Sequence, residues 1–251
     1  MLLGEPARTP ADLHFRLFGI PVRVHPFFWI VSLLLGMGGG PADPVNSLIF
    51  VAVVFVSVLV HEFGHALMQR YYGGHPWITL YGLGGLASCD DCDRSPGAQI
   101  LILLAGPGAG FLLAGLVVAF LASLGRVAGF DLDLMPVQWT PFDLPYYQAN
   151  NKLSPQDELI WDLLLVNILW GLINLLPVYP LDGGQIAREV FTLRAARAGI
   201  IRSLQLSIAT AAVVACYALL QKQVYVGLMF GFLAYGSFRA LSEYRGRSTW
   251  R

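Results

Sequence analysis

The chain has 251 residues, of which 56% are hydrophobic and 13% are charged, and its formal net charge at pH 7 is zero. Average soluble domains carry about twice this share of charged residues, and the mean hydropathy of +0.60 indicates more apolar surface than one soluble core can bury. The composition therefore excludes an ordinary soluble domain. It also lacks the basic excess that a nucleic-acid partner requires, so the expected partners are the lipid bilayer and proteins within it.

Six apolar segments are predicted to cross the membrane as helices, which makes the fold class an all-α polytopic membrane protein. The first segment is the shortest and is expected either to begin near Ile20 or to be partly shielded by neighbouring helices. Residues 1–24 otherwise form a polar lead. The predicted spans cover residues 27–37, 44–70, 99–124, 157–176, 202–221 and 224–241.

Two connecting segments have a different character. Residues 77–83 (WITLYGL) are aromatic and β-prone but too short to cross the bilayer, so they predict a short membrane-associated β-hairpin or re-entrant strand between the second and third spans. Residues 125–157 contain several acids and prolines, which predicts a loop in water. Small residues at 105–110 in the third span are expected to serve helix packing.

The distribution of basic residues predicts the orientation. With both termini in the cytoplasm, every Lys and Arg except Arg126, Lys152 and Lys222 falls on a cytoplasmic segment, as the positive-inside rule requires. The protein is therefore expected to be a multi-pass protein of the cell (inner) membrane. The same assignment puts the C-terminal part of the second span and the break at Pro177 on the cytoplasmic side, at one depth.

The second predicted span contains the sequence His61-Glu62-Phe63-Gly64-His65. Histidines four residues apart lie on one face of a helix, one turn from each other, where a single metal ion can contact both. Ionisable side chains are costly inside a membrane and usually have a function there. This pattern predicts a metal site in which Glu62 projects from the neighbouring face as a general base.

Asp182 is predicted to be the third metal ligand. A catalytic zinc takes three protein ligands and keeps a fourth position for water. Asp182 follows the break made by Pro177 and Pro180, and two glycines behind it are expected to let the backbone turn sharply toward its neighbour. The expected chemistry is peptide hydrolysis by metal-activated water, with Glu62 passing the proton to the leaving amine.

HEFGH at 61–65, together with NLLPVYPLDGG at 174–184, resembles the site-2 protease family of intramembrane zinc metalloproteases, peptidase family M50. The resemblance runs from residue 19 through Gly84-Gly85 and Ala105-Gly106-Pro107 to Gly184. It implies one Zn²⁺ per chain on His61, His65 and Asp182, Glu62 as catalytic acid and base, and Asn174 as a polar active-site residue. It also implies regulated cleavage of membrane-embedded protein segments.

The resemblance also implies the domain organisation. Residues 1–251 are expected to form a single intramembrane metalloprotease domain with a core at 20–184 and additional membrane helices at 200–241. No PDZ or CBS domain is expected. Gly110 departs from the family, because many members have an asparagine there, and a helix-to-helix hydrogen bond from that position is expected to be missing.

Several alternatives stay open. The chain could be a metal-ion transporter or an inactive relative that binds membrane proteins, although a transport path would place polar groups along more than one span. Asn174 could instead bond a neighbouring helix. Cys89 and Cys92 form a single CxxC without a second pair, so neither redox nor structural zinc chemistry is expected, and His75 is expected to be interfacial or structural. The exposed edge of the strand at 77–83 is predicted to hold unwound substrate by β-addition.

Overall fold

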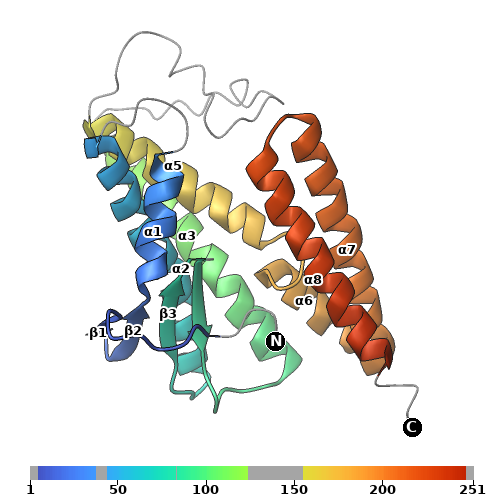
Figure 1. Ribbon diagram of the computed structural model, residues 1–251. Helices are drawn as coiled ribbons and strands as arrows, with labels where there is room; N and C mark the ends of the chain where they lie inside the picture. Colours follow the sequence, from blue (N-terminus) through green and yellow to red (C-terminus); the bar gives the residue numbers. More distant parts are fainter. Residues whose placement is uncertain (1–4, 38–43, 83, 124–154, 247–251) are drawn as a thin grey trace. The chain divides into compact units, whose positions relative to one another are not determined.

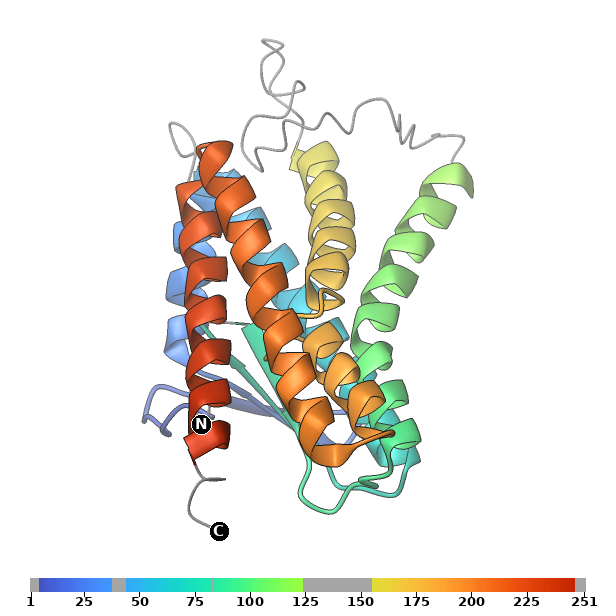
Figure 2. The same ribbon diagram turned by 90° about the vertical axis from the view of Figure 1, so that its right-hand side faces the viewer.

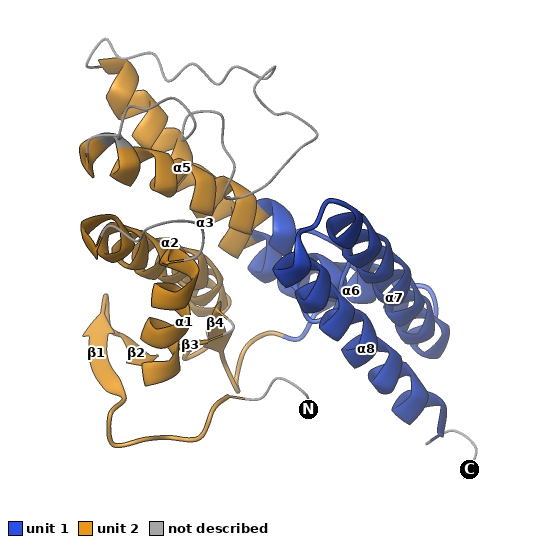
Figure 3. Ribbon diagram, turned by 45° about the horizontal axis from the view of Figure 1, so that its top comes forward, with its two compact units in different colours: residues 1–4, 94–104, 172–251 blue, residues 5–93, 105–171 orange. Residues whose placement is uncertain are grey.

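The computed structural model describes residues 5–37, 44–82, 84–123 and 155–246 (Figure 1). Most of the predicted polar loop at 125–157 lies outside these residues. The chain divides into two compact units, coloured in Figure 3. Unit 1 comprises residues 1–4, 94–104 and 172–251, and unit 2 comprises residues 5–93 and 105–171.

The described residues form seven helices and four strands. The helices are α1 (Pro26–Gly36), α2 (Pro44–Tyr71), α3 (Pro96–Ser123), α5 (Pro155–Asn174), α6 (Asp182–Thr192), α7 (Ala196–Leu220) and α8 (Val224–Gly246). The strands are β1 (Leu13–Leu17), β2 (Ile20–Val24), β3 (Trp77–Tyr81) and β4 (Gly84–Ser88).

Four helices, α2, α3, α7 and α8, are long and apolar enough to cross a membrane. The other two segments predicted to be spans differ from them. α1 is apolar but has only 11 residues, and α5 has 20 residues with three acidic residues in its first half. The described structure is therefore a mostly helical chain with four candidate spans, and the count of six stays a prediction.

The N-terminal residues correct the sequence prediction. The segment taken as a polar lead, with a first span reaching back toward Ile20, instead forms the antiparallel hairpin of β1 and β2. Its turn consists of Phe18 and Gly19, with φ of 49° and 79°, as in the two-residue turns that match the twist of paired strands. A five-residue alternation is too short to stand out beside the long apolar segments, which explains the miss.

The four strands form one sheet in the order β1-β2-β3-β4. β2 and β3 are parallel, and β3 and β4 are antiparallel, with Tyr81 opposite Gly84. This pairing contradicts the prediction that the strand at 77–83 offers a free edge, because β3 is paired on both sides. The free edge beside it belongs to β4, which among the described residues pairs with β3 alone.

One face of the sheet forms the core of unit 2. Alternate side chains of β2 and β3 point to this face and pack with α1 and α2, the two helices drawn beside these strands in Figure 1. The cluster contains Ile20, Val22, Val24, Phe28, Val58, Leu59, Phe63, Ala66, Ile78 and Leu80. The core therefore fixes the HEFGH segment of α2 through Phe63, which lies between the two histidines.

The other face of the sheet carries a buried polar cluster around Arg23. Arg23 and Thr79 are paired across β2 and β3. The Arg23 guanidinium lies 3.0 Å from a carboxylate oxygen of Glu5 and 3.0 Å from one of Asp12, and the Thr79 hydroxyl donates to Glu5. These bonds hold the segment before β1 against the sheet.

This cluster predicts an acid-dependent loss of stability. Hydrogen bonds from Thr9, with help from Arg23, lower the pKa of Asp12 from 3.8 to about 2. Because the folded-state pKa is depressed, the stabilisation is complete above about pH 4 and disappears as the pH falls through about 2. In thermal unfolding, Asp12→Asn should melt below wild type at pH 6, and the two curves should converge toward pH 2. An unchanged gap at both pH values would contradict the assignment.

Unit 1 is built on a pair of neighbouring helices, α7 and α8 (Figure 2). Val178 is fully buried against Ala211, Ala215 and Phe230 from these helices. The backbone of Tyr179 is bonded on both sides: its N–H donates to the Ser207 hydroxyl at 3.0 Å, and its carbonyl accepts from the Ser237 hydroxyl at 3.2 Å. α7 and α8 therefore fix the segment that leads to Asp182.

Candidate metal centre

His61 and His65 lie on one buried face of α2, as the spacing predicts. Their Nε2 atoms are 3.1 Å apart, and the side chains belong to residues that are 4% and 6% exposed. Two nitrogens that bind one tetrahedral zinc at about 2.0–2.1 Å lie roughly 3.3 Å from each other. The distance between these two imidazoles therefore fits a shared metal ion.

A close contact between α2 and α3 positions His65. Gly64 faces Ala105 of α3, and a Cβ at residue 64 would overlap its carbonyl oxygen. One residue further along α3, a Cβ at Gly106 would overlap the His65 imidazole ring. Ala105 and Gly106 thus serve packing, as predicted, and Gly106 also leaves the space that the His65 ring occupies.

Glu62 is buried against strand β4. The residue is 5% exposed, and a Cβ at Gly85 would lie 2.6 Å from both the carboxyl carbon and Oε1 of Glu62. Only glycine at position 85 therefore leaves space for the Glu62 side chain. It sets the carboxylate beside the backbone of the edge strand.

A polar contact joins α5 to α2 one turn before His61. The Asn167 side-chain amide donates to the Ser57 hydroxyl at 2.8 Å and to the Leu163 carbonyl at 2.8 Å. The Asn167 side-chain oxygen faces Gly110 on α3. Although residue 110 is a glycine, a helix-to-helix hydrogen bond is thus present nearby, supplied by a different helix.

Asn174 and Asp182 flank the proline-containing segment of unit 1. Asn174 ends α5 and Asp182 begins α6, and each residue is 8% exposed. The helix break predicted at Pro177 is confirmed, because α5 ends three residues before it.

The glycines after Asp182 act differently from the prediction. Gly183 and Gly184 belong to the first turn of α6, and Cβ atoms there would overlap backbone atoms of Leu175, Val178 and Tyr179. They are required by close approach of the chain to itself rather than by a sharp turn.

The five predicted site residues are thus distributed over both units. His61, Glu62 and His65 lie together in unit 2, whereas Asn174 and Asp182 belong to unit 1 (Figure 3). Sequence reasoning missed the positioning roles of Gly85, Gly106 and Asn167. The first two stood within the family resemblance but had no assigned contact, and the only signal for Asn167 was an amide inside an apolar helix.

The chain is similar in sequence to several known proteins. The chain is 28% identical over 184 residues to a zinc metalloprotease of Methanocaldococcus jannaschii, covering 71% of this chain and 44% of the relative. It therefore spans less than half the length of that protein. It is 24% identical over 236 residues to stage IV sporulation protein FB of Bacillus subtilis, covering 91% of this chain and 67% of that protein.

The fold is also similar to a solved structure. The site-2 protease from Methanocaldococcus jannaschii matches with a TM-score of 0.58 and 22% identity over 92% of this chain and 95% of that chain. The family model for peptidase family M50 matches residues 49–152 and 141–219, which include both motifs. With its apolar helices, the chain is an integral membrane protein. It belongs to peptidase family M50.

Proposed function

We propose that this chain is an intramembrane zinc metalloprotease that hydrolyses peptide bonds in membrane-embedded segments of other proteins. The observation that carries the proposal is the buried pair of His61 and His65, whose Nε2 atoms are 3.1 Å apart on an apolar helix with Glu62 between them in sequence. A structural role alone gives no reason to bury two imidazoles and a carboxylate on one helix of a membrane protein.

His61, His65 and Asp182 would hold one Zn²⁺ per chain. Each offers a ligand atom of a type that zinc accepts, two imidazole nitrogens and one carboxylate oxygen. When bound, zinc supplies Lewis-acid polarisation of the scissile carbonyl and lowers the pKa of a water molecule toward neutrality. Two observations support Asp182 as the third ligand. It is buried at the start of α6, and the segment before it is hydrogen-bonded to α7 and α8.

Glu62 would move the proton in this reaction. Its carboxylate accepts a proton from the attacking water and delivers it to the nitrogen of the leaving amine. The contact with Gly85 fixes where the carboxylate can lie. Asn174 would contribute an amide that holds the substrate or the developing oxyanion.

The edge of β4 would hold the substrate extended. A helical substrate has its carbonyls bonded internally and must unwind before hydrolysis, and an exposed strand edge replaces the lost backbone partners. In an antiparallel pair, alternate residues direct their backbone groups away from the partner strand. Gln69 donates to the Ala87 carbonyl at 3.3 Å, which assigns Ala87, and by alternation Gly85, to the outer edge. A peptide paired there would lie beside Glu62.

Ala87→Pro tests this edge. The substitution removes an outward N–H while leaving the β3 ladder in place, so cleavage of a helical single-span peptide should fall about tenfold, the equivalent of one lost hydrogen bond of about 1.4 kcal/mol. Ala87→Ser retains the N–H and serves as the matched control. Equal turnover for both variants, at equal melting temperature, would remove β4 from the substrate site.

The proposal also includes the membrane arrangement. Six spans, with α1 and α5 shielded by neighbours, would place both termini in the cytoplasm of a cell with the protein in its inner membrane. The distribution of Lys and Arg supports this orientation. One metalloprotease domain over residues 1–251, with its core at 20–184, is the corresponding domain organisation.

Purified protein in lipid vesicles tests the function. A panel of single-span peptides should be cleaved by the zinc-loaded protein, cleavage should stop with a chelator, and it should return when zinc is added back. Zinc flux across the vesicle membrane, measured in the same samples, addresses the transporter alternative. Flux without cleavage would contradict the proposal and favour a transporter.

A further inference from the structure

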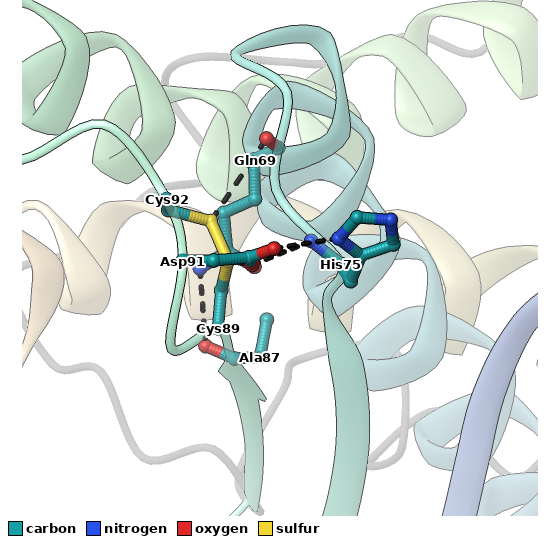
Figure 4. The surroundings of a disulfide bond; sticks show 6 residues. All are labelled: Gln69, His75, Ala87, Cys89, Asp91 and Cys92. Carbon is teal, nitrogen blue, oxygen red and sulfur yellow. Dashed lines mark hydrogen bonds and ion pairs between the residues drawn. A yellow bond between two sulfur atoms is a disulfide. The ribbon is translucent and has the colours of Figure 1, made fainter.

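A second group of metal-binding side chains lies in the connection between β4 and α3. Cys89 and Cys92 form a disulfide there, and Figure 4 shows Asp91 and His75 beside it. None of these residues belongs to the proposed catalytic centre.

The donor atoms of this group converge. One ligand atom each from Cys89, Asp91 and Cys92 lies within 4.8 Å of the other two, and the Cys89 sulfur is 3.3 Å from the Asp91 carboxylate. Two sulfurs and one carboxylate are donors that zinc-like divalent ions accept.

His75 orients the carboxylate. Its backbone N–H donates to Asp91 Oδ1 at 2.8 Å, and its Nδ1 lies 2.6 Å from Oδ2. Such outer partners fix the orientation of a metal-binding carboxylate.

The surrounding backbone is fitted to both sulfurs. A Cβ at Gly74 would overlap the sulfur of Cys92 and lie 2.5 Å from that of Cys89. Gly74 is in turn tied to the end of α2, because its N–H donates to the Gln69 carbonyl at 3.1 Å. Cys92 is 8% exposed. Cys89 and Cys92 are therefore held in place by close contacts with the end of α2 and do not lie on a loose loop.

We propose that reduction of the Cys89–Cys92 disulfide opens a second metal site, in which Cys89, Asp91 and Cys92 bind a thiophilic divalent cation of the zinc class and His75 positions Asp91. A dithiol reductant supplies two electrons and two protons, becomes a disulfide itself and leaves two thiols. Metal binding then releases both thiol protons to the solvent. Oxidation of the two cysteines closes the site.

Cobalt titration tests the site, because thiolate-to-Co²⁺ charge transfer absorbs in the near ultraviolet only when sulfur binds the metal. Reduced, metal-free full-length protein in detergent should develop this band, and the band should saturate by two Co²⁺ per chain, one at the second site and one at the proposed catalytic centre. The same protein kept oxidised should show none. Since the comparison uses one chain in two redox states, it needs no substitution that could disturb folding.

Variants assign the ligands. Cys89→Ser with Cys92→Ser should abolish the band, whereas Cys216→Ser, which changes the remaining cysteine on α7, should retain it. His75→Ala should weaken Co²⁺ binding about 10- to 100-fold without removing the band. A band in the oxidised protein, a band in the double serine variant, or no band in reduced wild type would each overturn the proposal.

The charge-transfer band of the second site does not depend on the catalytic centre. His61→Ala with His65→Ala leaves both sulfurs in place and should retain the charge-transfer band while losing peptide cleavage. A failure of the second site and a failure of the protease proposal are therefore separate outcomes.

Discussion

Glu62→Gln should lower peptide cleavage about 10³-fold, within the range that general acid–base groups contribute. The amide cannot accept the proton of the attacking water. Because Gln has nearly the shape of Glu and the contact with Gly85 is preserved, the zinc content should equal that of wild type. Turnover of a fluorescent single-span peptide and metal analysis of the same sample measure both quantities.

Glu243→Gln is the matched control, since this glutamate lies exposed on α8 and pairs only with Arg239 among the ion pairs described. It should retain wild-type turnover. If Glu62→Gln and Glu243→Gln cleaved at the same rate, Glu62 would not be the proton-transfer group.

Gly106→Ala should lower zinc affinity by at least about tenfold, comparable to the loss of a group that orients a metal ligand. The added methyl group occupies the space of the His65 imidazole, so the ring must rotate away from His61. Zinc titration with a competing chelator gives the affinity directly.

Gly108→Ala provides the comparison on the same helix, because a Cβ at that position meets nothing within 4 Å. It should bind zinc as wild type does. Equal losses in both variants would indicate a general effect of alanine on α3 rather than displacement of His65.

The shared face of His61 and His65 on α2 could be predicted from sequence because the helical period alone places residues four apart on one face. The structure confirms that spacing for His61 and His65. The contacts that hold the face in place could not be predicted. A Cβ at Gly85 or Gly106 would overlap a side chain of a different element. No local sequence pattern contains that information.

The pairing of the strands in the sheet likewise could not be predicted from local sequence. β3 was predicted from its β-prone composition, but its neighbours are set by long-range pairing. Once β2 pairs with β3 on one side and β4 on the other, the free edge moves to β4. We therefore place the extended substrate on β4, where Gly85 contacts Glu62. Nothing in the sequence indicates this contact.

α5 is a predicted span that carries its own polar groups. α5 has the length of a span, yet its acidic first half keeps it outside the four candidates. Asn167 on the same helix bonds Ser57. Both features fit a helix shielded by protein, since polar groups in a bilayer need partners.

The most direct test of the central claim is mass spectrometry of a single-span peptide incubated in ¹⁸O-labelled water with the zinc-loaded protein in lipid. Hydrolysis predicts two fragments, with one ¹⁸O in the new carboxyl group, for wild type and almost none for Glu62→Gln. Intact peptide after incubation with zinc-loaded wild type, or labelled fragments at equal yield from Glu62→Gln, would contradict the account.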